Sequence, residues 1–541
     1  MRIEKINESE PLMKCRENAQ SVETTGLLLL GDQNAAVTCL LAAWQTAYRR
    51  HDFYLGLVME QRNSYKDGKG KAQPGGKSGR PNTDDLYEDR LSRSSDETPV
   101  MGAERRAGVI QLKLPLSPLD NRGRNGTTET KSIPITQEMV IAAYKRVKKN
   151  KGAAGIDGES LEKFEEKLSD NLYLIWNRLS SGSYRSTSVL EVEIPKDDGR
   201  KRKLGIPIVR DRIAQQVVKD YLENRFEAIF SESSYGYRPL RSTHQALAQV
   251  RRNVREFEWV IDMDISSFFD KMSHELLMKA IERHVEEKWV KMYLTRWLEA
   301  PIEDRKGNKR LRGGEGTPQG GVISPLLANL FLHYAFDKWL GKEYPKLRFV
   351  RYADDIIVHC NTQSEAEEVL KAIRERMAEC KLELNEKKTK IVYCKKARRN
   401  ADYKTVQFDF LGFSFQPRPA MNKEEGRMFL GFDCAISKKN EKKIIDEIRK
   451  SDFHRWTNRD IYYIAAHFNP KISSWIDHFG IFRKHELQWI FNVFHRRLNK
   501  WVVNRYKRFK GSHRKAGRWI RDLAKRQPDI FVHWQHGFET A

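Results

Sequence analysis

Apolar and polar residues alternate along the chain with two periods, and the period changes at definite places. From residue 135, ITQEMVIAAYKRVKK repeats apolar residues at helical spacing, with Thr136 as a predicted N-cap. Segment 189–208 alternates with a period of two around a DDG turn, and 347–360 places two apolar strands around a pair of aspartates, so both predict hairpins. After residue 430 the pattern is helical. Short strands among many helices, without regular βαβ alternation, predict an α+β fold.

The first part of the chain follows neither period for long. Residues 1–60 contain segments that predict one or two helices, but 61–131 are rich in Gly, Pro, Ser, Asn and charged residues. Such composition predicts a linker or disorder. We therefore expect residues 1–134 to form a largely disordered extension without catalytic residues.

Composition narrows the class of partner. The 541 residues carry a formal net charge of +25, which indicates a polyanion, with nucleic acid favoured over an anionic membrane surface. No apolar run approaches the roughly 20 residues of a spanning helix. Six cysteines occur without a CxxC pair, so neither a disulfide framework nor a zinc site is expected. These features favour a cytoplasmic protein that does not contact membranes.

Four aspartates are the strongest candidates for chemistry. Asp262 and Asp264 in VIDMDI share one face of a predicted strand, and Asp354 and Asp355 lie at the predicted hairpin tip. If the two strands pair, three carboxylates converge into a set of oxygen ligands that suits Mg²⁺ and two-metal phosphoryl transfer. A DD pair in a turn is more often only a turn, so these residues alone predict metal-dependent phosphate chemistry and no more.

Six short blocks resemble those of group II intron-encoded reverse transcriptases. In chain order they are KGAAGIDG at 151–158, IPKDDGRKRKLGIP at 194–207, SYGYRP at 234–239, TPQGG at 317–321, YADD at 352–355 and FLGFSF at 410–415. NPKISSWIDHFGIFRK and AKRQPDIFVHW resemble the maturase region of that family. The resemblance runs from about residue 135 to the end, and it implies a right-hand polymerase with fingers at 135–254, palm at 255–416 and a helical thumb/maturase region at 417–541.

The resemblance also implies roles for individual residues. Asp264, preferred to Asp262, would join Asp354 and Asp355 as catalytic residues that bind two Mg²⁺ ions, with Mn²⁺ as a possible substitute. Residues implied to bind the incoming dNTP are Lys196, Arg202, Phe269 as a gate against ribose, Gln319 and Gly320. Those implied to contact primer or RNA are Arg238, Arg241, Leu411 and Gly412. Two simpler readings remain open: Phe269 as a buried aromatic, and the Lys196 to Arg202 segment as a solvated hairpin.

The C-terminal segment concentrates positive charge. Residues 481–541 hold 15 Lys and Arg against 4 Asp and Glu, and aromatic residues lie between the basic ones. We expect RNA contacts from Arg505, Lys507 and Arg508, and base stacking on rings such as Trp501, Tyr506 or Trp519. The alternative is an ordinary helix with Trp501 and Val502 in the core and a solvated basic face.

These features together predict an RNA-directed DNA polymerase encoded by a group II intron. Its expected partners are intron RNA as template, a DNA primer or target, and dNTPs, and it would assist splicing and mobility of the intron. The Cys/His endonuclease that ends many relatives is expected to be absent. Alternatives are a domesticated reverse transcriptase for phage defence or CRISPR adaptation, and a splicing maturase with little polymerase activity. Monomer and homodimer both remain open.

Overall fold

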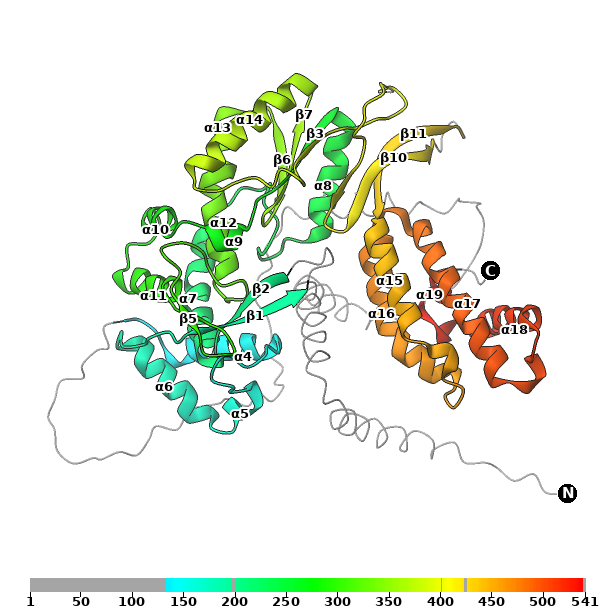
Figure 1. Ribbon diagram of the computed structural model, residues 1–541, viewed down its shortest axis with the longest axis horizontal. Coiled ribbons are helices and arrows are strands. Elements are labelled where there is room, and N and C mark those ends of the chain that lie inside the picture. Colours follow the sequence, from blue (N-terminus) through cyan, green and yellow to red (C-terminus); the bar gives the residue numbers. More distant parts are fainter. Residues whose placement is uncertain (1–132, 196–200, 400, 423–425, 539–541) are drawn as a thin grey trace, which may run out of the picture.

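The computed structural model describes residues 133–195, 201–399, 401–422 and 426–538. Nearly all of the predicted N-terminal extension lies outside these residues, and so does Lys196. Figure 1 shows a body built around a central sheet, with a bundle of helices beyond it that follows the long β10–β11 hairpin in sequence. Strands and helices mix without βαβ repetition, so the α+β prediction is confirmed.

The first third of the described chain consists of helices around one hairpin. The side chain of Thr136 caps the first helix by accepting a hydrogen bond from the Met139 amide at 3.3 Å, as the sequence predicted. The predicted 189–208 hairpin is present, with Leu190 opposite Ile206. The elements are α4 (Gln137–Lys149), α5 (Leu161–Glu165), α6 (Leu168–Ser180), β1 (Val189–Pro195), β2 (Lys201–Ile206), α7 (Val209–Glu227) and α8 (Thr243–Glu256).

The central part supplies the sheet that carries the acidic residues. The strands of this central part of the chain are β3 (Trp259–Asp264), β4 (Ile302–Glu303), β5 (Lys309–Arg310), β6 (Arg348–Tyr352), β7 (Asp355–Cys360) and β8 (Lys390–Tyr393). Its helices are α9 (Phe268–Lys271), α10 (His274–Glu282), α11 (Lys288–Leu298), α12 (Ser324–Leu332), the π-helix η1 (His333–Asp337), α13 (Lys338–Glu343) and α14 (Gln363–Glu379). β6, β7, β3 and β8 form one sheet in that order, while β4 and β5 extend the first hairpin.

Both faces of the central sheet are packed. Because successive side chains of a strand point to opposite faces, Ile261 and Met263 of β3 join one apolar cluster, and Val260 joins another on the opposite side. Asp262 and Asp264 are in phase with Val260 and therefore lie on its face. They add acidic side chains to the face on which Val260 packs.

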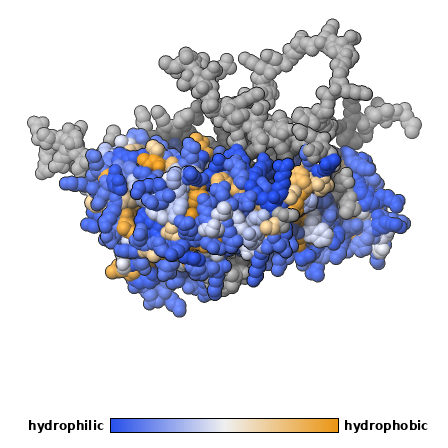
Figure 2. Space-filling model, turned by 90° about the horizontal axis from the view of Figure 1, so that it is seen from above, coloured by the Kyte–Doolittle hydropathy of each residue, from blue (hydrophilic) through white to orange (hydrophobic). Residues whose placement is uncertain are grey.

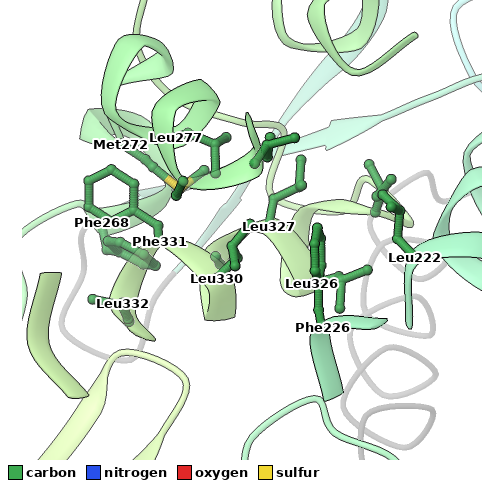
Figure 3. Close-up of a cluster of buried hydrophobic side chains, with 14 of the residues drawn as sticks. Leu222, Phe226, Phe268, Met272, Leu277, Leu326, Leu327, Leu330, Phe331 and Leu332 are labelled. Atoms are coloured by element: carbon green, nitrogen blue, oxygen red, sulfur yellow. The ribbon is translucent and has the colours of Figure 1, made fainter. Parts of the chain in front are cut away.

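Helix α12 is the centre of the first apolar cluster. Leu326, Leu330 and Phe331 of this helix are buried, and Figure 3 shows them between side chains of α7 and those of α9 and α10. Pro325 occupies the first turn of the helix, where a missing amide hydrogen does not matter. The helix thus links the segments that flank the acidic strands.

The C-terminal part begins with three strands and continues as helices. They are β9 (Phe408–Phe410), β10 (Phe413–Met421), β11 (Met428–Ile436), α15 (Lys438–Lys450), α16 (Ile461–Arg483), α17 (Gln488–Arg505), α18 (His513–Arg526) and α19 (Val532–Gln535), with 3₁₀ turns η2 (Phe453–Arg455), η3 (Lys484–Leu487), η4 (Lys507–Phe509) and η5 (Pro528–Ile530). Helix was predicted from residue 430, and this is wrong by several residues, because MFLGFDCAI pairs along the whole of β10.

The surface is mainly hydrophilic. Figure 2 shows one face of the molecule covered by polar residues, with apolar residues only in scattered patches. Among the helices within the described ranges, none is both long enough and apolar enough to cross a membrane.

Replacing Leu330 by alanine should destabilise the fold. Its side chain is fully buried in the middle of α12, so truncation removes apolar contacts and leaves a cavity that costs about 2–5 kcal/mol. Urea unfolding monitored by circular dichroism measures the change. The matched control is Leu311→Ala, because Leu311 is 76% exposed and its truncation should change stability by less than about 0.5 kcal/mol. Equal losses in both variants would contradict the assigned core.

Candidate active site

Two antiparallel strands bring the acidic residues together. β3 pairs with β7 from Trp259 opposite Cys360 to Asp264 opposite Asp355. Residues directly opposite each other in such a pair have Cα atoms about 4.5–5.5 Å apart and side chains on one face. The predicted strand pairing is therefore present, and it places Asp264 beside Asp355.

The third carboxylate belongs to the turn that joins β6 to β7. Tyr352 pairs with Asp355, which leaves Ala353 and Asp354 as a two-residue turn. Only Ala353 of the two has a positive φ, +57°, as in the first central position of a type II′ turn. Burial and, after it, repulsion from Asp264 raise the pKa of Asp354, so the turn holds this carboxylate within electrostatic reach of the strand end.

Three side chains that the sequence analysis did not single out contact the acidic residues. Lys388 Nζ lies 2.9 Å from both oxygens of Asp264, and Asn385 donates to Asp264 Oδ2 at 3.2 Å. Lys390 Nζ lies 3.7 Å from Asp262 Oδ2. The two lysines are two residues apart, as are the two aspartates, and β8 pairs with β3 so that Lys390 faces Asp262. The shared period of two was a signal for Lys390, which lies in β8, whereas Lys388 and Asn385 precede that strand.

The acidic cluster is short of positive charge. Desolvation by the surrounding protein, followed by repulsion from its acidic neighbours, raises the pKa of Asp355 to about 7, although its side chain still reaches solvent at the end of β7. Burial raises the pKa of Asp262 to about 7, against the attraction of Lys390. Burial also raises the pKa of Asp354. A cation between these carboxylates would remove the repulsion.

The donor set fits a hard divalent cation. Carboxylate oxygens are the ligands that Mg²⁺ accepts in proteins, usually one or two together with water and substrate phosphate. In the described part of the chain, no three His, Cys, Asp or Glu side chains already stand in the arrangement of a metal site. The Asp264 carboxylate instead accepts hydrogen bonds from Lys388 and Asn385. A cation held by Asp264 would compete with Lys388 for the same carboxylate oxygens.

Residues implied to bind the nucleotide lie around this cluster. The pKa of Asp354 is raised by burial, and attraction to Arg202 offsets part of this rise. Arg202 of the β1–β2 hairpin therefore lies within electrostatic reach of the turn. Phe269 is half-buried, its ring centroid is 5.4 Å from that of Phe268, and its carbonyl accepts a hydrogen bond from Thr317 at 2.7 Å. The loop of Thr317 therefore fixes the backbone of Phe269, and the ring keeps one side open.

The TPQGG loop packs directly on the β1–β2 hairpin. The Gln319 carbonyl accepts a hydrogen bond from the Gly205 amide at 2.9 Å. Gly320 has φ +125°, and a Cβ built on it would lie 2.6 Å from the Gly205 carbonyl oxygen, so no side chain fits there. The structure thus brings Arg202, Phe269, Gln319 and Gly320 to one region.

Comparison with known proteins decides the family. Residues 194–415 match the model of the reverse transcriptase (RNA-dependent DNA polymerase) family, which includes both acidic strands and the TPQGG loop. Protein YkfC of Escherichia coli (strain K12) is 34% identical over 298 residues, which are 48% of this chain and 77% of that protein. The chain belongs to the reverse transcriptase family.

The relatives narrow the family to group II intron-encoded proteins. The group II intron-encoded protein LtrA of Lactococcus lactis subsp. cremoris is 32% identical over 267 residues, which are 48% of this chain but only 43% of LtrA. The match to telomerase from Candida albicans, solved with a fragment of telomeric RNA, covers 66% of both chains at 13% identity and a TM-score of 0.37. The predicted family, group II intron reverse transcriptase/maturase, is confirmed.

In this reverse transcriptase, the turn implied to position the primer lies at the edge of the bundle. Leu411 and Gly412 join β9 to β10 with φ values of +49° and +88°, the pattern of a type I′ turn. The Gly412 carbonyl accepts hydrogen bonds from the Ser437 amide and from Asn440 Nδ2, both at 3.0 Å. The turn is therefore held by the start of α15.

The predicted RNA contact by Arg238 is wrong. Its side chain is buried, and its guanidinium donates to the Glu227 carboxylate and to the carbonyls of Ser231 and Ser234. A phosphate would have to compete with all of these bonds in a site that excludes solvent. Arg241 is more open, with its guanidinium 5.5 Å from the Tyr235 ring centroid, and its RNA contact stays a prediction.

The basic C-terminal surface contains both the predicted charges and a packed aromatic cluster. Lys507 and Arg508 are exposed, and Arg508 lies 4.7 Å from the Phe509 ring centroid and 5.9 Å from that of Trp519. Arg505 is half-buried and donates to the Thr457 carbonyl. The predicted base stacking on Trp501 is wrong and the alternative of a core residue holds, because Trp501 is fully buried and its indole donates to the Trp456 carbonyl at 3.0 Å.

In metal-free protein, Asp355→Asn should raise the melting temperature more at pH 8 than at pH 5. The pKa of the folded carboxyl is raised from 3.8 to about 7, so the folded state keeps a proton that the unfolded state has lost. Its contribution to stability is present below pH 3.8 and is lost as the pH rises through about 7. Asparagine removes this loss. Thermal unfolding in EDTA at both pH values measures the difference in melting temperature between the variant and the wild type.

The control for this prediction is Asp402→Asn. The Asp402 side chain is 99% exposed and lies outside the acidic cluster, so its replacement should shift the melting temperature equally at both pH values. Added Mg²⁺ should then stabilise the wild type more than Asp355→Asn. A pH-independent effect of Asp355→Asn would show that the carboxylates do not repel one another.

Proposed function

We propose that this reverse transcriptase copies an RNA template into DNA by extending the 3′ hydroxyl of a primer with dNTPs, and that Asp264, Asp354 and Asp355 hold two Mg²⁺ ions, with Mn²⁺ as a substitute. The family match supports RNA-directed DNA synthesis. The observation that carries the site is the register that sets Asp264 opposite Asp355. The raised pKa values around it support the need for cations.

The chain's own residues would prepare the substrates. When bound, divalent cations at such a site activate the attacking hydroxyl and neutralise the leaving pyrophosphate. Arg202 and Lys196 would pair with the triphosphate, since guanidinium and ammonium groups bind phosphate oxygens. Phe269 would fill the space of a ribose 2′-hydroxyl. The close packing of Gln319 and Gly320 on the hairpin would let their backbone line the nucleotide.

We assign 135–254 to the fingers, 255–416 to the palm and 417–541 to the thumb and maturase region. The position of the acidic strands within the second segment supports this division. The third segment would bind the RNA of the intron that encodes the protein and assist its splicing and mobility. Exposed basic residues on η4 and α18 support RNA binding, since phosphate contacts supply affinity that depends on salt.

Replacing Asp354 by asparagine should abolish cDNA synthesis. The change removes one metal-binding charge but keeps the size of the side chain, and a loss of several kcal/mol of transition-state stabilisation corresponds to about a 10³-fold lower rate. Primer extension on an RNA template with Mg²⁺ measures the rate. RNA affinity, measured by filter binding, should stay within about twofold because phosphate contacts are unchanged. Continued synthesis by Asp354→Asn would refute the assigned site.

The double substitution Lys507→Ala and Arg508→Ala should weaken RNA binding and its dependence on salt. Each lost phosphate contact lowers the slope of log affinity against log salt by about one. Filter binding of the group II intron RNA over a salt series measures both quantities. The matched control is Lys342→Ala with Lys346→Ala, two exposed lysines of the central part. Equal effects of the two double variants would place the RNA elsewhere.

A further inference from the structure

A charged side chain is completely buried directly beneath the acidic turn. Arg351 belongs to β6, one residue before Tyr352, and its side chain is 0% exposed. Burying an isolated guanidinium is unfavourable unless its charge and its donors are satisfied. The contacts of Arg351 therefore show which parts of the fold depend on it.

Four hydrogen bonds account for the guanidinium. Nε donates to Asp337 Oδ1 at 2.7 Å and Nη2 donates to Asp337 Oδ2 at 2.5 Å, which makes a two-bond pair with the carboxylate. Nη1 donates to Asn329 Oδ1 at 2.9 Å. Nη1 also donates to the carbonyl of Ala353 at 3.2 Å. One side chain thus joins α12, the π-helix η1 and the acidic turn.

The bond to Ala353 acts on the backbone next to Asp354. The Ala353 carbonyl belongs to the peptide plane that leads into Asp354, so holding this oxygen restrains the direction in which the Asp354 side chain leaves the turn. Ala353 has φ +57°, a conformation that costs a residue with a Cβ about 1–2 kcal/mol. Such a conformation persists only where its surroundings enforce it. Arg351 is the side chain that bonds to it.

A second segment fixes the same turn from its other side. Asn329 Nδ2 donates to the Gly236 carbonyl at 2.7 Å. A Cβ built on Gly236 would lie 2.4 Å from the Ala353 amide nitrogen, so Gly236 and Ala353 touch through their backbones. The Arg351 backbone also exchanges hydrogen bonds with this segment, accepting from the Tyr235 amide and donating to the Ser233 carbonyl, both at 2.8 Å.

The negative charge of Asp337 is paired with Arg351 and not with its neighbour His333. Asp337 ends the five-residue π-helix His333–Asp337, a distortion that occurs often at functional sites. His333 is the other titratable group beside it, with Nδ1 3.9 Å from Asp337 Oδ2. Burial lowers the pKa of His333 to about 4, so the imidazole is neutral near pH 7 and leaves the negative charge to the guanidinium.

We propose that Arg351, supported by Asp337 and Asn329, is a positioning residue that holds the Ala353–Asp354 peptide and so aims the Asp354 carboxylate toward the cation site it shares with Asp264. This inference rests on the proposed function of that site. Arg351 touches neither substrate nor cation. It acts through the backbone of the turn, and its effect should therefore appear in the turnover rate and in cation binding.

The test replaces both members of the buried pair, Arg351→Met together with Asp337→Leu. Exchanging a buried ion pair for apolar residues of similar size is often neutral for stability, whereas the hydrogen bond to Ala353 is lost. We expect kcat of primer extension to fall about 10²-fold, as for a small misplacement of a reacting group. The Mg²⁺ concentration for half-maximal activity should rise about 10- to 100-fold. The KM for dNTP should change little.

A second measurement does not depend on activity. Binding of Mn²⁺ to the protein with template and primer, followed by the electron paramagnetic resonance signal of free Mn²⁺, should weaken about 10- to 100-fold in the double variant. The matched control is Arg225→Met with Glu287→Leu, a two-bond arginine–carboxylate pair at 2.9 Å between α7 and the start of α11. That control should keep the wild-type kcat and Mn²⁺ affinity.

Two outcomes would overturn the inference. One is a double variant with wild-type kcat and Mn²⁺ affinity, and the other is a lower melting temperature with unchanged kcat for each folded molecule. If the double variant does not fold, Asn329→Ala decides, because it removes the link to Gly236 without stranding a charge and should still raise the Mg²⁺ requirement. If the wild type makes no cDNA, the proposed function fails, while the Mn²⁺ measurement still tests the positioning role.

Discussion

The register between β3 and β7 is the constraint on which the rest of the site depends. It sets two carboxylates side by side at the end of a sheet that has an apolar cluster packed on each face. Like charges at that distance repel, and surrounding protein strengthens the repulsion. Without a ligand, this arrangement of carboxylates destabilises the fold. It therefore indicates a site for a ligand of opposite charge rather than a structural role.

Neighbouring segments hold this unfavourable arrangement in place. Lys388, in the segment before β8, neutralises Asp264. The buried guanidinium of Arg351 restrains the turn through its hydrogen bond to the Ala353 carbonyl. The TPQGG loop closes the side that faces the β1–β2 hairpin through the contact of Gly320 with Gly205. These supports come from parts of the sequence far from the aspartates. The site is therefore a property of the folded chain rather than of the YADD motif alone.

The sequence predicted the parts of this site that local pattern controls. A strand, a turn and a strand around Asp354, and spaced acids in the preceding strand, follow from alternation and turn chemistry. The extent of β11 was missed because MFLGFDCAI is an apolar run, which periodicity cannot assign to helix or strand. Arg238 was misjudged because sequence does not show whether an arginine is exposed or enclosed by a carboxylate such as Glu227. The partners of Asp264 were missed because only tertiary pairing brings Lys388 to it.

The apolar cluster on the acidic face of the sheet has a mechanical consequence. The same cluster that contains Val260 of β3 and Ile357 of β7 continues through Phe413 of β10 to Trp501 and Phe509 beside the basic surface. Close-packed interiors resist compression and transmit displacement. An RNA bound to the basic helices would therefore lie at a fixed distance from the acidic turn. The length of this apolar cluster would then determine the position on a bound RNA at which copying begins.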